Sequence, residues 1–238
     1  MRIMAPPPSR YGPLHALAAG AVLVFAVLSN GFAAFWRQFL HGLDIRLDEK
    51  TVLPLLGWNA LFFGGLLVAL WLTTVFRRRT GGRVSSRTAA MRFALVATAP
   101  ICLAALGINW ACGELLARFA ELDLSDQTLV KAVTENAFST GGKTMLFAFL
   151  LLEAPLLEEP LFRGVVFGGL SKAMPVWMAA TVSGFLFALI HVNAATFIPL
   201  WFLGVAFAWL YARTGTLLAP MAVHFAFNAV NLILCLIF

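Results

Sequence analysis

Residues 151–164 read LLEAPLLEEPLFRG, and this stretch decides how the chain must fold. It holds Glu153, Glu158, Glu159 and Arg163, although apolar residues dominate the sequence on both sides. A charged side chain at the centre of a bilayer helix costs on the order of 2.5–3.5 kcal/mol on insertion scales. Several such residues in one short stretch therefore need a structural or chemical reason.

The composition indicates that the stretch lies in a membrane protein. Apolar residues make up 61% of the 238 residues and charged residues only 12%, whereas a soluble domain is about half apolar and about one quarter charged. A soluble protein of this length cannot hide so many apolar side chains, so lipid must surround much of the chain. This excludes a disordered chain, a secreted disulfide scaffold and a free cytosolic enzyme. The net charge of +6 is concentrated in one short loop, so it indicates membrane topology and not nucleic-acid binding.

Apolar runs of membrane-spanning length recur along the chain. A transmembrane helix needs about 20 mainly apolar residues. Only helices and closed barrels satisfy their backbone groups in lipid, and these runs are too long and too uniformly apolar for barrel strands. The sequence therefore predicts an all-α, polytopic transmembrane helical bundle of about 7 spans, with 8 possible. The predicted spans are roughly His15–Trp36, Val52–Phe76, Ala89–Ala111, a run between Lys143 and Lys172, Pro175–Ala194, Phe197–Tyr211 and Leu217–Phe238.

Loop charges predict the orientation of these spans. The loop between the second and third spans is rich in arginine and has no acid. Its basic residues are Arg77, Arg78, Arg79, Arg83 and Arg87. The positive-inside rule makes this loop cytoplasmic, and counting back makes the N-terminus cytoplasmic as well. We expect a multi-pass integral membrane protein. Its short length and lack of long loops favour the bacterial plasma membrane.

The charges of the fourth span do not reduce to one ion pair. Glu159 and Arg163 are four residues apart, so they share a helix face and can pair. Glu158 is turned about 100° away and keeps a free carboxylate. A pair that merely locks two helices explains Glu159 and Arg163 but not Glu158. Two adjacent carboxylates in a low dielectric suit a proton-transfer group. Pro155 and Pro160 each remove a helix hydrogen bond, and irregular backbone at membrane depth is tolerated where it lines a cavity.

Two histidines lie in other spans, His191 in the fifth and His224 in the seventh. A lone histidine in a span is often a packing residue, but two of them opposite a glutamate pair favour a site. With about 1.5 Å of rise per residue, folding the fourth and fifth spans into a hairpin puts Glu158 within about 4–5 Å of the depth of His191. By the same count His224 lies about 10 Å less deep in the membrane than His191. A tilted helix or a raised loop must make up this difference in depth.

Three short motifs then become visible. They are EEPLFRG at 158–164, FALIH at 187–191 and HFAFN at 224–228. They resemble the Glu-Glu-x-x-x-Arg, Phe-x-x-x-His and His-x-x-x-Asn motifs of the CPBP family, the intramembrane proteases that include CAAX prenyl protease 2 and the bacteriocin-processing, abortive-infection-type proteins. One such motif is weak evidence, but three in the right order and in separate apolar spans are a strong signal.

The resemblance divides the chain into two parts. Residues 141–238 are expected to form a CPBP-like catalytic helical core, whereas 1–140 form N-terminal transmembrane helices and loops without an assigned role. The resemblance implies peptide-bond hydrolysis in a catalytic cavity inside the bilayer. The residues it implies for the site are Glu158, Glu159, His191, His224 and Asn228, with Arg163 and Phe187 supporting them.

Water is the expected nucleophile, because the chain has no Gly-x-Ser-x-Gly motif. Its cysteines lie outside the three motifs and are interpreted as buried free thiols; they are Cys102, Cys112 and Cys235. In our hypothesis Glu158 deprotonates water with the help of His191, while His224 and Asn228 donate hydrogen bonds to the oxyanion. The sequence does not distinguish whether Glu158 or Glu159 is the base.

Several alternatives stay open. Glu158, His191 and His224 could form a catalytic zinc set, but no His-Glu-x-x-His helix demands a metal, and no cofactor is favoured. A non-catalytic immunity or scaffold protein would use the same polar core only to order its helices. A transporter or proton relay is less favoured, because the sequence has no internal repeat. The expected partners are the lipid bilayer and a membrane-associated protein or peptide substrate, whose prenylation is not assumed.

Overall fold

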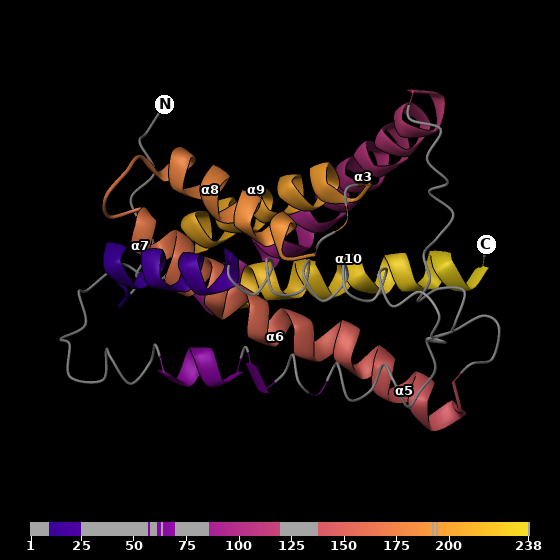
Figure 1. Ribbon diagram of the computed structural model, residues 1–238, viewed down its shortest axis with the longest axis horizontal. Helices are drawn as coiled ribbons and strands as arrows, with labels where there is room; N and C mark the ends of the chain where they lie inside the picture. The colour runs from indigo at the N-terminus through magenta and orange to yellow at the C-terminus, as the bar shows by residue number, and fades with distance from the viewer. Residues whose placement is uncertain are drawn as a thin grey trace, which may run out of the picture.

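The computed structural model describes residues 10–24, 57, 61–62, 64–69, 86–119, 138–191, 193 and 195–237. Every regular element in these ranges is a helix, which confirms the predicted all-α fold (Figure 1). The elements that build the site are α3 (Arg87–Phe119), α5 (Thr140–Ala148), the π-helical segment η1 (Phe149–Glu153), α6 (Ala154–Glu159), the π-helical segment η2 (Pro160–Phe167), α7 (Gly168–Leu170), α8 (Val176–Leu189), α9 (Phe197–Thr214) and α10 (Leu218–Ile237). A further apolar helix covers Pro13–Val24.

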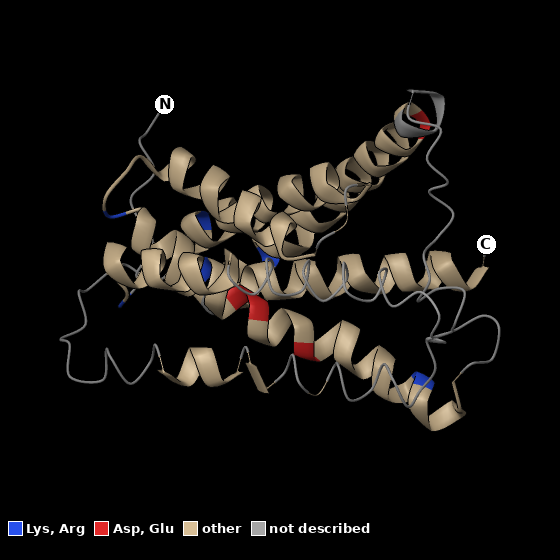
Figure 2. Cartoon of the chain, in the orientation of Figure 1, with Lys and Arg blue, Asp and Glu red and all other residues tan. Residues whose placement is uncertain are grey.

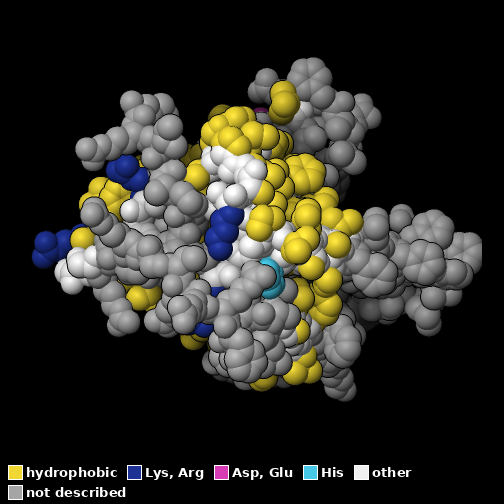
Figure 3. Space-filling model, turned by 90° about the vertical axis from the view of Figure 1, so that its left-hand side faces the viewer, with side chains coloured by type: hydrophobic (Ala, Val, Ile, Leu, Met, Phe, Trp, Pro, Cys, Tyr) yellow, Lys and Arg dark blue, Asp and Glu magenta, His cyan; other side chains and the backbone are white. Residues whose placement is uncertain are grey.

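Among the residues that the structure describes, three helices are long and apolar enough to cross a membrane. They are Thr88–Leu115, Phe197–Thr214 and Leu218–Ile237, and they correspond to the predicted third, sixth and seventh spans. Apolar side chains cover much of the described surface, as expected where lipid is the solvent (Figure 3). The first span beyond Val24, most of the second span and nearly all of the arginine-rich loop lie outside the described residues.

The fourth span is a single run of helix in which two π-helical segments, η1 and η2, alternate with α-helix. Pro155 is among the first residues of α6, and Pro160 begins η2. Because proline has no N–H to close an ordinary α-helical turn, the backbone widens into π turns there instead of breaking. The irregular backbone expected from the two prolines thus takes the form of η1 and η2, along the run labelled α5 to α7 in Figure 1.

The core of the described bundle surrounds η2. All residues from Leu161 to Phe167 are buried, as expected for a helix with neighbours on every side. Ser183 in α8 donates a hydrogen bond to the carbonyl oxygen of Phe162 at 2.9 Å, which ties α8 to this segment. Acidic positions lie near the middle of this run of helix rather than at its ends (Figure 2).

Helices α8 and α9 approach each other closely at two glycines. A Cβ atom added to Gly204 would lie 2.5 Å from the Cα atom of Gly184, so only residues without a side chain fit at this crossing. Helix α8 ends at Leu189, earlier than the predicted limit at Ala194. Beyond it, Asn193 Oδ1 accepts hydrogen bonds from the amides that lead into α9. His191 therefore lies in the turn after α8 and not within the helix.

Candidate active site

Glu159 lies at the centre of the polar cluster and is fully buried. Its Oε2 atom is 3.1 Å from Arg163 Nε, and its Oε1 atom accepts a hydrogen bond from His224 Nδ1 at 2.9 Å. A buried carboxylate is tolerated only when its charge is paired. Both oxygens of Glu159 are thus used to hold neighbouring side chains, and this residue does not line the cavity described below.

Arg163 is also fully buried, in a box of aromatic rings. Its guanidinium carbon lies 4.6 Å from the ring centroid of Phe187, 5.1 Å from that of Phe207 and 5.7 Å from that of Phe162. Among the described residues, its nitrogens have no aligned hydrogen-bond partner. Cation–π contacts therefore carry much of the stabilisation of this charge, together with the carboxylate of Glu159. A flat guanidinium suits this box better than the compact ammonium of lysine.

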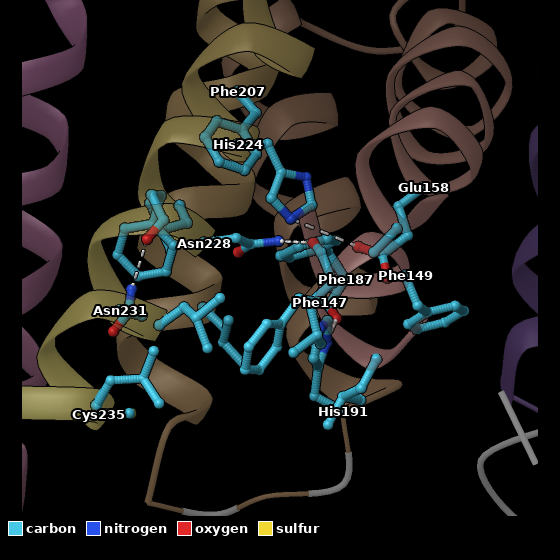
Figure 4. A pocket seen from close by; sticks show the side chains of 18 residues that line it. Phe147, Phe149, Glu158, Phe187, His191, Phe207, His224, Asn228, Asn231 and Cys235 are labelled. Atoms are coloured by element: carbon cyan, nitrogen blue, oxygen red, sulfur yellow. Dashed lines mark hydrogen bonds and ion pairs between the residues drawn. The ribbon is translucent and has the colours of Figure 1, made fainter. Parts of the chain in front are cut away.

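His224 connects the two glutamates. Since the Glu159 carboxylate accepts its hydrogen bond, His224 Nδ1 carries a proton and the Nε2 atom is the one that faces Glu158. The distance from His224 Nε2 to Glu158 Oε2 is 3.9 Å. The imidazole also stacks on the ring of Phe207, with 5.1 Å between centroids. The hydrogen bond to Glu159 shows that Nδ1 carries a proton, and the contacts together fix the position of the ring. Figure 4 shows His224 between Phe207 and Glu158.

Glu158 faces a cavity of about 390 Å³ inside the bundle. Its side chain is 15% exposed, unlike that of Glu159. Together with Glu158, the side chains of His191, His224 and Asn228 bring polar groups to the wall, whereas most other lining residues are leucines and phenylalanines (Figure 4). The cavity therefore combines an acid–imidazole cluster with a mainly apolar space.

His191 reaches the cavity from the turn after α8. Its Nδ1 atom lies 2.8 Å from the carbonyl oxygen of Phe187. A carbonyl only accepts, so Nδ1 carries a proton, and in the neutral imidazole Nε2 then has a free lone pair. The described residues show no ion pair or hydrogen bond between His191 and Glu158, although both line the same cavity. The predicted partnership of these two residues thus stays a prediction, and His224 is the imidazole in contact with Glu158.

Asn228 is held by the π-helical backbone. Its Nδ2 atom donates to the carbonyl oxygen of Leu150 at 2.8 Å. In a regular α-helix Pro155 would orphan the carbonyl of Leu151, which is what the sequence predicts. In η1 the amide of Ala154 bonds to Phe149, five residues back, so in this register Pro155 leaves Leu150 without its backbone donor. Asn228 supplies the missing donor and joins α10 to η1.

The described acid and imidazole groups at the cavity do not form a metal-binding site. Within the described part of the chain, no group of three or more His, Cys, Asp or Glu side chains is arranged to hold a metal ion. The three zinc candidates named above line one cavity but do not form such a group. We therefore derive no step of the reaction through a metal.

The cavity includes residues that the sequence motifs do not contain. Asn231 and Cys235 on α10 both line it, as does Phe207 on α9. For Asn231 a signal was available, because it follows Asn228 by three residues and so shares its helix face. The sequence holds no such signal for Phe207, because its position at the cavity depends on how α9 packs against α10.

Fold and site together define a helical membrane protein with a buried acid–imidazole cluster beside an apolar cavity. Residues 140–230 match the family described as type II CAAX prenyl endopeptidase Rce1-like. The matched part of the chain contains the whole cluster. The resemblance seen in the three motifs is thereby confirmed.

The similar curated proteins include a protease, a putative peptidase and a protein named as an acyltransferase. The membrane-embedded CAAX protease MroQ of Staphylococcus aureus (strain USA300) is 38% identical over 103 residues, which is 40% of this chain and 41% of that protein. The putative membrane peptidase YdiL of Bacillus subtilis (strain 168) is 32% identical over 74 residues, 31% of this chain and 30% of that protein. A protein named glycerol-3-phosphate acyltransferase from Methylorubrum extorquens (strain PA1) is 32% identical over 152 residues, 54% of this chain and 75% of that protein.

The first two of these matches span less than half of the length of the relatives concerned. No solved structure matches the chain.

Proposed function

We propose that this chain is an intramembrane endopeptidase that hydrolyses a peptide bond of a membrane-associated protein or peptide. One observation carries the proposal: His224 lies between Glu158 and Glu159 at the wall of an apolar cavity. The match of residues 140–230 to the Rce1-like family supports it, and so do the peptidase names of MroQ and YdiL. An apolar cavity with a few polar groups suits a substrate that arrives from the bilayer.

In the proposed reaction Glu158 is the general base. It faces the cavity, whereas both oxygens of Glu159 are held by Arg163 and His224 and have no place for water. This difference favours Glu158 over Glu159, which the sequence alone left exchangeable. His191 orients the attacking water, because its free Nε2 atom can accept a hydrogen bond from it.

In the remaining steps Glu158 carries one proton from the attacking water to the departing amine. Glu158 takes a proton from water while the oxygen of that water forms a bond to the peptide carbonyl carbon. When His224 carries protons on both nitrogens, its Nε2–H and the second amide hydrogen of Asn228 donate to the oxyanion that results. The protonated Glu158 then gives its proton to the departing amine as the C–N bond breaks. Glu159 and Arg163 hold His224 and the fourth span in place and do not touch the substrate.

Replacing Glu158 with Gln tests this assignment. The variant keeps the shape of the side chain but cannot take a proton, so we expect cleavage to fall by about 10²–10⁴-fold. Glu153 offers a matched control, because it lies on the same run of helix in η1 and does not line the cavity. Glu153→Gln should cleave as the wild type does. Comparative profiling of protein termini in cells with wild-type or Glu158→Gln protein supplies the substrate and the readout.

Full activity of purified Glu158→Gln protein would contradict the assignment. A non-catalytic scaffold predicts instead that Glu158→Gln changes neither termini nor partner binding once the protein is folded. A proton relay predicts a loss of proton flux in vesicles with no change in any terminus. The same set of variants therefore separates the three classes.

Metal removal gives a second test. Because the described donors form no metal-binding group, the proposal predicts that purified protein keeps its cleavage activity after treatment with 1,10-phenanthroline. Loss of activity that zinc add-back restores would replace the metal-free proposal with the zinc alternative. Metal analysis of the same samples should follow the activity, whichever result is obtained.

Acyl transfer to glycerol 3-phosphate, the activity named for one relative, is less well supported by the site. A phosphate group is bound in proteins by arginine, lysine or exposed backbone amides. Among the described residues that line the cavity there is no lysine or arginine, and Arg163 is enclosed by aromatic rings. An acyl-transfer assay with glycerol 3-phosphate should therefore give no product.

A further inference from the structure

The wall that α10 gives to the cavity is polar for two helical turns. His224, Asn228 and Asn231 all line the cavity, because spacings of four and three residues put them on one helix face. His224 and Asn228 have roles in the proposed reaction, but Asn231 belongs to none of the three motifs. A polar amide at membrane depth is costly unless its atoms find partners. Asn231 therefore needs a reason of its own.

One end of the Asn231 amide is already bound. Its Nδ2 atom donates to the carbonyl oxygen of Phe227 at 2.9 Å. Because that carbonyl only accepts, the nitrogen is the end that faces the helix backbone and Oδ1 is the end left over. No described residue donates a hydrogen bond to Oδ1. Figure 4 shows Asn231 further along α10 than Asn228, on the side away from His224.

The surroundings of this free acceptor are apolar. The cavity-lining residues next to Asn231 along α10 include Phe227, Leu232 and Leu236. A peptide that enters such a space loses its water, and each of its backbone N–H groups then needs an acceptor. Asn231 Oδ1 is an acceptor that this part of the cavity offers.

The spacing along α10 fixes where on a substrate this contact falls. Asn231 follows His224 by seven residues, which is about 10 Å of helix rise at about 1.5 Å per residue. An extended peptide advances about 3.3 Å per residue. A peptide lying along α10 with its scissile bond at Glu158 and His224 therefore brings a backbone N–H to Asn231 about three residues from that bond.

We propose that Asn231 is a specificity-determining residue that binds the substrate backbone. Its Oδ1 atom accepts a hydrogen bond from a peptide N–H about three residues from the scissile bond. This inference rests on the proposed function and deepens it. Substrate selection at that position then depends on the peptide backbone and not on the side chain. Because proline has no N–H, a substrate with proline there is cleaved poorly.

A double-mutant cycle between protein and peptide tests the inference. The probes are palmitoylated, fluorescent, apolar decapeptides in which each peptide bond in turn is replaced by an ester, which removes one N–H and keeps the shape. With wild-type protein we expect the ester about three residues from the cleaved bond to lower kcat/KM by about three- to ten-fold, mainly through KM. In Asn231→Leu the same ester should cause no further loss.

Two further variants control for structure. Asn231→Asp keeps an acceptor oxygen at the same place and should keep the sensitivity to the ester. Ile233→Ala changes an exposed residue of α10 that does not line the cavity, and it should behave as the wild type. Equal ester effects in wild-type and Asn231→Leu protein at every bond would overturn the inference.

Peptide binding to Glu158→Gln protein separates this inference from the proposed function. Cleavage by the wild type without any Asn231-dependent ester effect leaves the protease standing and overturns the role of Asn231. An Asn231-dependent ester effect on binding, without cleavage by the wild type, supports that role and overturns the protease. Absence of both cleavage and the ester effect overturns both.

Discussion

Arg163 is a fully buried cation that is held by one carboxylate and three aromatic rings. Removing one partner of a buried ion pair typically costs about 3–5 kcal/mol, because the other charge stays behind unpaired, whereas replacing both partners with apolar side chains costs much less. Arg163→Met should therefore lower the free energy of unfolding by about 3–5 kcal/mol. The double variant Glu159→Leu, Arg163→Met should lose less stability than the single one. Unfolding curves in detergent measure both.

The cleavage activity of the double variant Glu159→Leu, Arg163→Met should not follow its stability. The double variant also removes the acceptor of His224 Nδ1, so it should stay folded and yet cleave poorly. An Arg163→Met variant as stable as the wild type would show that the buried Glu159 carboxylate does not need Arg163 as its partner.

Local spacing predicts part of this cluster. The pairing of Glu159 with Arg163 follows from their separation by four residues. The bond from His224 to Glu159 joins residues 65 apart in the chain, and no local pattern contains it. The same holds for the contact of Asn228 with Leu150, which depends on a backbone register that the prolines allow but do not specify.

At the scale of elements, the crossing of α8 and α9 holds the wall that carries Phe187. A methyl group on Gly204 would meet the backbone of Gly184 at 2.5–3.2 Å, so Gly204→Ala must push the two helices apart. Overpacking of this kind costs about 1–3 kcal/mol, and cleavage should fall with stability. Thermal unfolding in detergent and the cleavage rate measure the two effects.

Gly107 in α3 supplies the matched control for this crossing. No described atom lies within 4 Å of the position that its Cβ would take. Gly107→Ala should be neutral or stabilise the helix by up to about 1 kcal/mol, the difference in helix propensity. If both alanine variants behave alike, the close approach of α8 and α9 does not limit stability.

Helices as such were predictable, but their ends and winding were not. Long apolar runs predict α3, α9 and α10, and the structure confirms them. The end of α8 at Leu189 was missed because Val192 and Ala194 continue the apolar pattern, while Asn193 ends it through its hydrogen bonds. The prolines indicated irregular backbone, but only the three-dimensional register shows that it is π-helical.

At the scale of the whole molecule, the orientation in the membrane is a prediction from loop charge. If the loop with Arg77, Arg78 and Arg79 is cytoplasmic, green fluorescent protein inserted there should fluoresce in a bacterial host and alkaline phosphatase should be inactive. Asp126 lies between the predicted third and fourth spans, one crossing further along the chain, so alkaline phosphatase inserted there should be active. The reverse pattern at both sites would invert the predicted topology.

The arrangement of Glu158, His224, Glu159 and Arg163 has a consequence for how charge moves during the proposed reaction. The proposed reaction requires His224 to carry protons on both nitrogens, and in that form the two anions of this cluster balance its two cations. When Glu158 becomes neutral, an equal negative charge appears on the tetrahedral oxygen opposite the same imidazolium. The bilayer interior therefore never has to accommodate an extra ion, because hydrolysis only shifts an existing one across a few ångströms.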